Sequence, residues 1–231
     1  MKLKDDLLKK FGTDFSSNVN LSNYSWFNLG GNAEYFYKAQ DKDQLKKFLK
    51  EAKKQNLRIT ILGAGSNTLI RDKGLKGAVI KLGQNFSYIK VIDKDILEVG
   101  AATLDRKVSN FAKDNNLANL EFLSCIPGSI GGAIIMNSGC YDNEISKVFI
   151  SLIAIDKKKL TEIEIKKEDI KFLYRGTNLP DDLIIISAKF KGQISNKDAI
   201  EKKQANLIAR KKTSQPSQVK TCGSTFKNIS N

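Results

Sequence analysis

Hydrophobic and polar positions change period several times along this 231-residue chain, so the pattern predicts both strands and helices. Helical periodicity begins at three predicted cap residues, Asp41, Thr103 and Asn196, and an N-terminal helix precedes them. Strands in groups of two and three with helices between them predict an α+β fold. The predicted helices span 1–10, 41–55, 103–115 and 196–212. The predicted strands span 33–39, 58–62, 78–82, 86–92, 95–100, 148–155, 160–165 and 182–190.

The polar segment 192–197 is the best candidate boundary between a main domain and a C-terminal module. Residues 1–20 are predicted as an N-terminal helix and loop, and the Asn- and Ser-rich loop continues to Asn32. Residues 21–191 form the predicted main domain. The module at 192–231 has too few apolar residues for a core of its own. It either packs on the main domain or begins something longer.

A predicted buried strand ends in a loop of small residues, which are Gly63, Ala64, Gly65, Ser66 and Asn67. Glycine adopts positive φ and has no Cβ, so backbone N–H groups in such a loop can surround a phosphate. Ser66 and Asn67 add hydrogen-bonding side chains without bulk. The loop has neither the Gly-Lys-Ser/Thr ending of a Walker loop nor the GxGxxG spacing that opens a helix. Alone, it is equally consistent with a tight turn.

A second loop of this kind spans residues 125–133. Pro127 fixes φ, whereas Gly128, Gly131 and Gly132 permit close packing or the approach of a ligand. Two such loops on separate strand–helix units predict a diphosphate and its attached ring system held from two sides. The alternative is that the two turns pack on each other without a ligand.

The net charge of +14 raises the question of a nucleic-acid partner. Of 39 basic residues only five are Arg, and the lysine clusters contain no interleaved aromatic residues. Nucleic-acid readers favour Arg forks and aromatic stacking surfaces. The sequence therefore predicts a lysine-rich solvated surface that attracts anionic substrates such as nucleotides at low salt.

The three cysteines form no CxxC pair, and the absence of histidine excludes a Cys/His zinc site and a His-based triad. No apolar run approaches the roughly 18 residues that span a bilayer. The N-terminal ten residues predict an amphipathic helix, not a secretory signal. We therefore expect a cytoplasmic protein with reduced thiols, no metal, and no membrane or nucleic-acid partner.

Five ordered motifs resemble the UDP-N-acetylenolpyruvoylglucosamine reductase (UDP-N-acetylmuramate dehydrogenase) family. Residues 24–31 resemble its opening motif, 62–67 its first FAD loop, and 126–132 with Asn137 and Gly139 its second. Tyr174–Arg175 and 222–228 resemble its catalytic segments. The resemblance implies a p-cresol-methylhydroxylase-type FAD-binding domain of two α+β subdomains over 21–191, then the start of a substrate-binding domain. The implied FAD-binding residues are Gly63, Ala64, Gly65, Ser66, Asn67, Gly128, Ser129, Ile130, Gly131, Gly132, Asn137 and Gly139.

The family chemistry implies non-covalent FAD, NADPH as hydride source, and the enol-ether double bond of a UDP-sugar as acceptor in peptidoglycan synthesis. Hydride addition at one carbon gives its neighbour enolate character, which calls for electrostatic stabilisation and a proton donor. Ser224 matches the family's proton donor, and Arg175 matches the arginine that binds the substrate carboxylate. The implied substrate-binding residues are Tyr174, Lys227 and Asn228. We expect a monomer.

The family continues past the segment that matches 222–228, and a late glutamate there is its third catalytic residue. The present sequence stops at Asn231, which predicts either a truncated chain or a short form. In both cases we expect FAD binding to persist and turnover to be largely lost. Two other functions stay open: an FAD-dependent oxidase of the same superfamily, which would not need Tyr174–Arg175, and a non-catalytic flavin- or nucleotide-binding remnant.

Overall fold

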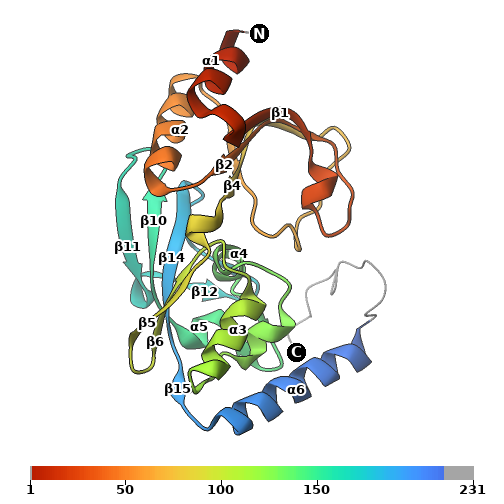
Figure 1. The fold of residues 1–231 in the computed structure, drawn as a ribbon, viewed down its shortest axis with the longest axis vertical. Coiled ribbons are helices and arrows are strands. Elements are labelled where there is room, and N and C mark those ends of the chain that lie inside the picture. The colour runs from red at the N-terminus through yellow and green to blue at the C-terminus, as the bar shows by residue number, and fades with distance from the viewer. Residues whose placement is uncertain (1, 216–231) are drawn as a thin grey trace.

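The computed structural model describes residues 2–215, which fold around two β-sheets (Figure 1). The predicted α+β class is confirmed. Sheet A lies in the upper part of the view with helices α1 and α2, and the second sheet, sheet B, continues below it beside α3, α4 and α5. The helices are α1 (Lys2–Phe11), α2 (Lys42–Lys54), α3 (Asp105–Asp114), α4 (Ile130–Ile135), α5 (Ile145–Val148) and α6 (Lys197–Ser214).

Sheet A has four strands in the order β1-β2-β4-β3. Strand β1 is antiparallel to β2, whereas the β2–β4 and β3–β4 pairs are parallel. The Asp41 carboxylate accepts a hydrogen bond from the Gln44 backbone N–H at 2.7 Å, which confirms the predicted N-cap of α2. The strands are β1 (Phe15–Asn20), β2 (Asn32–Ala39), β3 (Ile59–Ile61) and β4 (Leu75–Leu82).

Sheet B has five antiparallel strands in the order β11-β10-β14-β6-β5. Its strands lie where the apolar segments predicted them. Between β6 and β10 the chain leaves the sheet over residues 101–148, an excursion that contains α3, α4, α5 and the 3-10 helix η4 (Glu121–Cys125). The strands are β5 (Ile89–Asp93), β6 (Ile96–Gly100), β10 (Phe149–Asp156), β11 (Glu162–Lys166) and β14 (Leu183–Lys191).

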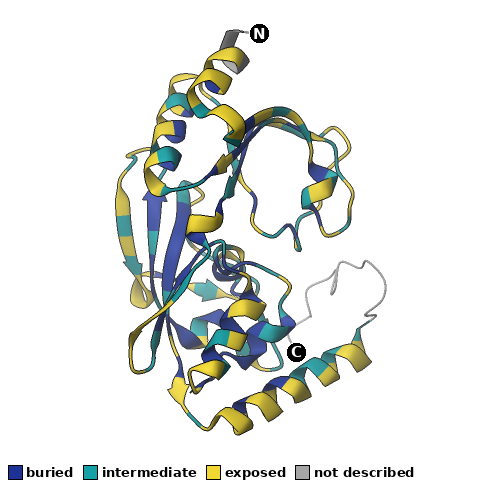
Figure 2. Cartoon of the chain, in the orientation of Figure 1, coloured by how far each residue is buried: buried dark blue, intermediate teal, exposed yellow. Residues whose placement is uncertain are grey.

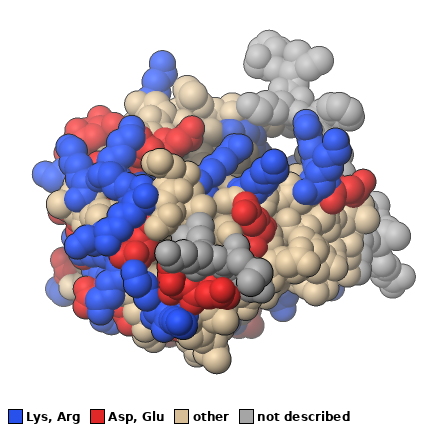
Figure 3. All heavy atoms as spheres, turned by 90° about the horizontal axis from the view of Figure 1, so that it is seen from above, with Lys and Arg blue, Asp and Glu red and all other residues tan. Residues whose placement is uncertain are grey.

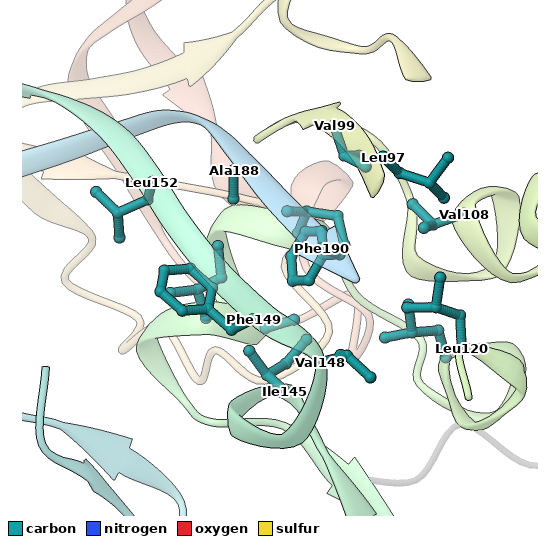
Figure 4. Packing of buried hydrophobic residues seen from close by; sticks show 14 of the residues in the cluster. Leu97, Val99, Val108, Leu120, Ile145, Val148, Phe149, Leu152, Ala188 and Phe190 are labelled. Atoms are coloured by element: carbon teal, nitrogen blue, oxygen red, sulfur yellow. The ribbon is translucent and has the colours of Figure 1, made fainter. Parts of the chain in front are cut away.

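The central strands β10 and β14 are largely buried (Figure 2) and take part in two hydrophobic cores. The larger core packs sheet B against the excursion, where Phe149, Phe190, Leu120, Val108 and Ile145 converge (Figure 4). The opposite face of these strands contributes Ile155, Ile184 and Ile186 to a core shared with sheet A, α1 and α2. One pair of strands therefore holds both halves of the molecule together.

Two local predictions outside the glycine-rich loops were wrong. Strand β1 occupies Phe15–Asn20, where a loop was expected, because five of its six residues are only partly buried or exposed and no apolar pattern marks it. The N-cap of α3 is Leu104 without a side-chain cap, while the Thr103 hydroxyl donates to the Tyr88 carbonyl at 3.1 Å. Thr103 thus ties the excursion to the segment before β5 and does not cap the helix.

The segment after residue 192 packs on the main body of the described structure. Strand β15 (Gln193–Ile194) pairs with β7 (Leu117–Ala118). The Asn196 side chain accepts from the Asp198 N–H at 2.8 Å, which confirms it as the N-cap of α6. On α6, buried Gln204 donates to the Ser109 hydroxyl at 3.0 Å. The proposed domain boundaries themselves stay a prediction.

Lysine and arginine side chains are scattered over the face in Figure 3, with acidic side chains between them. Within residues 2–215 no helix is both long enough and apolar enough to cross a membrane. The same part of the chain contains no group of three or more potential metal-ligating side chains.

Candidate functional site

The two glycine-rich loops, which come from different halves of the fold, meet each other. The first loop follows β3 of sheet A, and the second leads into α4 within the excursion from sheet B. A Cβ at Gly63 would lie 2.7 Å from the Ser129 hydroxyl oxygen, so these two residues are in close contact. Because Gly63 is also exposed to solvent, the junction of the loops is open to a ligand.

Position 65 must be glycine because the protein's own backbone leaves no room for a side chain there. Its φ is +72°, and a Cβ there would lie 1.9 Å from the Tyr24 carbonyl oxygen. The Gly65 carbonyl accepts from the Trp26 N–H at 3.0 Å. The sequence predicts that this glycine serves ligand approach, but the Tyr24 backbone fills its Cβ position. Ser66 is half-buried and Asn67 exposed, so these side chains remain accessible.

In the second segment, the glycines differ in what surrounds them. A Cβ at Gly128 would lie 2.5 Å from an Asp105 carboxyl oxygen, and one at Gly131 would lie 3.3 Å from the Ala101 Cβ. At Gly132 the nearest heavy atom would be 3.9 Å away. Residues 130–132, expected in a loop, form the first turn of α4. Only Gly132 of these three glycines has an unfilled Cβ position.

Asp105, the first residue of α3, is a buried carboxyl group behind the second loop. Neither of its carboxyl oxygens has a hydrogen-bond partner within the described residues. Its backbone N–H donates to the Gly128 carbonyl at 3.1 Å. Burial raises the pKa of this carboxyl group well above its ordinary value, because the charged form loses its hydration.

Replacing Asp105 should therefore change stability in a pH-dependent way. In the unfolded chain the carboxyl has its ordinary pKa of about 4, so its contribution to stability is full below that pH and is lost as pH rises toward the raised folded pKa. We expect Asp105→Asn to unfold like the wild type below about pH 4, and to gain up to about 1.4 kcal/mol per pH unit above it. Denaturant titrations from pH 3 to 8 measure this.

Asp114, at the C-terminal end of α3, serves as a control because its pKa shifts in the direction opposite to that of Asp105. The hydrogen bond from Lys197 lowers the pKa of Asp114, so Asp114→Asn should lose stability at neutral pH and not gain it. A constant difference between Asp105→Asn and wild type across the pH range would contradict the proposed burial of a neutral carboxyl.

Tyr174 and Arg175 lie at the tip of a hairpin formed by β12 (Phe172–Leu173) and β13 (Gly176–Thr177). This hairpin is tied to the segment after α4. The Arg175 Nη2 donates to the Gly139 carbonyl at 3.1 Å, and the Thr177 hydroxyl donates to the Ile135 carbonyl at 3.3 Å. The structure thus brings the predicted catalytic arginine beside the second predicted FAD segment.

Arg175 has a left-handed backbone, with φ of 58°. Non-glycine residues in this region cost about 1–3 kcal/mol and are concentrated at functional sites. The guanidinium carbon lies 4.8 Å from the Tyr174 ring centroid, within cation–π range. The hydrogen bond to the Gly139 carbonyl and this contact with the Tyr174 ring together hold the guanidinium group in one orientation.

Asn137 connects the hairpin to α5. Its amide nitrogen donates to the Leu173 carbonyl at 3.1 Å, and its amide oxygen accepts from the Ser146 N–H at 3.0 Å. The side chain is buried. Asn137 therefore positions the segment that carries Arg175, together with β8 (Gly139–Cys140) and β9 (Asn143–Glu144).

Cys125 and Cys140 flank the second segment and contact each other. The contact with the Cys140 thiol lowers the pKa of Cys125. On the other side of the pair, the Lys211 ammonium of α6 donates to the Cys125 carbonyl at 2.5 Å. The segment is therefore fixed from α6 as well.

A pocket of about 410 Å³ opens beside the first loop. It is lined by residues 23–26, Asn28, Ala64 and Lys81. The Lys81 ammonium donates to the Gly63 carbonyl at 2.6 Å. Burial, aided by nearby Lys38, lowers the pKa of Lys81. Sequence reasoning missed Trp26 and Lys81 as site residues: the first lies inside the opening motif, and the second is one of many lysines with no local signal.

The remaining predicted site residues, Ser224, Lys227 and Asn228, lie outside the described residues. The same holds for the position of Cys222. Their predicted roles therefore stay predictions, as does the expected loss of turnover.

Comparison with known proteins agrees with this arrangement. A family profile described as an FAD binding domain matches residues 33–158. The UDP-N-acetylenolpyruvoylglucosamine reductase of Pelagibacter ubique is 43% identical over 96% of this chain and 74% of its own length. The reductase structure from Thermus caldophilus superposes with a TM-score of 0.79 at 29% identity, covering 91% of this chain and 74% of that one.

A more distant structure, 6-hydroxy-D-nicotine oxidase from Arthrobacter nicotinovorans, matches 70% of this chain and 37% of its own with a TM-score of 0.54 at 12% identity. This likeness concerns the fold alone and agrees with the predicted p-cresol-methylhydroxylase-type FAD-binding domain. The chain thus carries an FAD-binding domain. Because it is 43% identical to one of these reductases over 96% of its length, the chain belongs to the UDP-N-acetylenolpyruvoylglucosamine reductase family.

Proposed function

We propose that this protein binds FAD non-covalently where its two glycine-rich loops meet, and reduces UDP-N-acetylenolpyruvoylglucosamine to UDP-N-acetylmuramate with NADPH. The observation that carries the proposal is the contact between Gly63 and Ser129, with Arg175 fixed at Gly139 beside the second loop. Loops that lie far apart in sequence converge at one solvent-accessible junction, next to a strained arginine. The names of the related reductases supply the reaction.

The residues present fit an FAD molecule. Gly132 leaves its Cβ position open, Asn67 is exposed, and the Lys81 cation lies under the Gly63 carbonyl. A diphosphate is an anion that accepts hydrogen bonds, so loop N–H groups and a lysine suit it. The chain has no histidine for covalent attachment, which supports non-covalent binding.

Bound FAD would supply hydride transfer, and the protein's residues would bind and orient the substrate. Arg175 would hold the substrate carboxylate with its planar fork and stabilise negative charge that develops beside it. Tyr174, whose ring lies along the guanidinium, would help to keep that fork in place. Ser224 would donate the proton to the neighbouring carbon, and Lys227 and Asn228 would contact the substrate.

Reconstitution with FAD tests the proposal. The purified protein, mixed with excess FAD and desalted, should keep a flavin absorbance spectrum, and acid should release the flavin into solution. Anaerobic NADPH should then bleach that spectrum. A desalted protein without flavin absorbance would refute FAD binding, and a flavin that NADPH cannot reduce would favour a non-catalytic flavin-binding remnant.

The Gly132→Ala variant tests whether Gly132 is needed for the stability of the protein or for the binding of FAD. Alanine fits the described structure, since its Cβ would meet no atom closer than 3.9 Å, and it favours helix α4 by about 0.5–1 kcal/mol over glycine. We expect the FAD-free variant to be at least as stable as wild type but to bind FAD more weakly. Fluorescence titration and thermal unfolding measure the two effects.

Gly176→Ala is the matched control, because a Cβ there also meets no atom within 4 Å but lies outside the predicted FAD loops. Unchanged FAD affinity in Gly132→Ala would mean that the cofactor does not approach this turn of α4.

The protein is further proposed to work as a monomer in the cytoplasm. Light scattering on the purified protein tests whether it is a monomer.

A further inference from the structure

Cys125 and Cys140 lie at the two ends of the second glycine-rich segment, and the reductase chemistry above uses neither of them. Both thiols are free. We propose that the two cysteines form an oxidation site, at which hydrogen peroxide converts the neighbouring thiols into a reversible disulfide. The bond would close residues 126–139 into a covalent loop. The disulfide does not depend on the proposed function, whereas its effect on FAD rests on that function.

The 3-10 helix η4 brings the two sulfur atoms together. The Cys140 Sγ donates to the Phe122 carbonyl at 3.3 Å. In a 3-10 helix the carbonyl of residue i points toward residue i+3, and Cys125, the last residue of η4, is three positions after Phe122. The two thiols are in contact there. A disulfide requires two cysteines whose side chains already approach each other, and this pair meets that condition.

Contacts from outside the segment hold both cysteines in place. The Lys211 ammonium of α6 donates to the Cys125 carbonyl at 2.5 Å. Cys140 belongs to β8, which pairs with β9. The carbonyl of its neighbour Gly139 accepts from the Arg175 guanidinium at 3.1 Å. Separate parts of the fold therefore present the two thiols to each other.

The surroundings favour the thiolate form that reacts with oxidants. The contact with the Cys140 thiol lowers the pKa of Cys125, although burial opposes that shift. The Ser124 hydroxyl, 3.8 Å from the Cys125 sulfur, and the Lys211 ammonium add to the lowering. Cysteines beside a lysine and hydrogen-bond donors are the reactive ones in proteins. Cys125 is buried and Cys140 is partly exposed, so a small oxidant reaches the pair from the Cys140 side.

The reaction balances with one molecule of hydrogen peroxide. The Cys125 thiolate attacks the O–O bond, which breaks, so that the sulfur becomes a sulfenic acid and the departing hydroxide takes up a proton to give water. The Cys140 sulfur then attacks the sulfenic sulfur. The S–S bond forms, and the hydroxyl group leaves with the Cys140 thiol proton as a second water. The two thiols lose two electrons, which the peroxide gains. A dithiol such as dithiothreitol reverses the bond by thiol–disulfide exchange.

The bond would fix the segment that carries much of the candidate site. Gly132, Asn137 and Gly139 all lie between the two cysteines. A cross-link that closes a loop of this length mainly restricts the unfolded chain. We therefore expect the unfolding temperature to rise by about 5–10 °C on oxidation. Since FAD would lie against this segment, its release should become severalfold slower when the segment cannot open.

Peptide mapping of the purified 231-residue chain tests the site without any cofactor. After peroxide treatment, blocking of the remaining thiols and digestion without reductant, we expect peptides joined through Cys125 and Cys140. Dithiothreitol should separate them and reverse the rise in unfolding temperature. Cys125→Ser and Cys140→Ser should each lose both effects. Cys222→Ser is the matched control and should keep both. Circular dichroism confirms that each variant is folded.

Two results would overturn the oxidation site. The first is wild-type protein in which excess peroxide leaves both thiols reduced or carries them to sulfinic acid without a bond. The second is a bond from either cysteine to Cys222 in place of the expected pair. In the FAD-loaded protein, a disulfide that leaves the rate of FAD release unchanged would contradict the fixing of the segment. Protein that takes up no FAD would refute the proposed function, and peptide mapping would still decide the disulfide.

Discussion

Gly65→Ala should abolish stable FAD binding. At φ of +72°, an alanine costs about 1–2 kcal/mol in the backbone alone. Its Cβ would also lie 1.9 Å from the Tyr24 carbonyl oxygen, so the loop and the segment of residues 24–26 must separate. That movement breaks the hydrogen bond between Trp26 and Gly65 and displaces both the loop and the pocket wall. When the variant is mixed with FAD at a 1:1 ratio and desalted, we expect it to retain no flavin absorbance.

Gly12→Ala is the control for backbone strain. Gly12 has a similar φ of +56°, but a Cβ there meets no atom within 4 Å. It precedes β1 and lies in neither glycine-rich loop. This variant should lose a comparable amount of stability and keep its FAD. Equal FAD binding by Gly65→Ala and wild type would show that the first loop does not hold the cofactor.

Arg175→Lys should disable the step that consumes the enolpyruvyl substrate while leaving flavin reduction intact. A lysine keeps the charge but cannot form two parallel hydrogen bonds to a carboxylate. Loss of a positioned donor at developing negative charge costs about 10²–10³-fold in rate. Stopped-flow mixing of the reduced flavoprotein with substrate, on a form of the protein that turns the substrate over before the substitution, should show that loss, and the absorbance change on substrate binding to the oxidised protein should shrink with it.

Arg175→Gly tests the strained backbone in the same experiment. Glycine adopts φ of 58° without steric penalty, so the variant should unfold at the same temperature as wild type or higher, yet be as slow as Arg175→Lys. Arg106→Lys, on the exposed side of α3, should behave as wild type in both half-reactions. Equal slowing of flavin reduction and reoxidation by Arg175→Lys would contradict the assigned role.

The central strands β10 and β14 of sheet B were predictable because most of their apolar residues are buried and many are β-branched, as in Leu183–Lys191 of β14. Strand β1 was not, since Phe15 is its only fully buried residue and backbone pairing with β2 holds the rest. Helix α4 was read as loop because Gly131 and Gly132 lower helix propensity, whereas packing of Ile130 and Ile134 in the core overrides it.

The candidate site was predictable only where a motif marked it. Motifs marked Gly63 and Gly132, whose FAD-binding roles stay predictions. They also marked Gly65 and Gly128, but Tyr24 and Asp105, which fill the Cβ positions there, approach from distant parts of the sequence. Lys81 carries no local signal among 39 basic residues, and only its bond to Gly63 distinguishes it. These features of the candidate site depend on contacts between segments far apart in the chain, which a local sequence pattern does not reveal.

The excursion over residues 101–148 has a consequence for biosynthesis. The first loop follows β3 of sheet A, whose strand pairing needs no later strand but whose core includes Ile155 of β10 and Ile184 and Ile186 of β14. Ser129, its partner in the second loop, depends on a core that includes Phe190 of β14. Both loops therefore depend on β14, and because domains fold as units during synthesis, the nascent chain should lack the complete site until β14 is made. Cofactor loading should therefore follow the synthesis of β14.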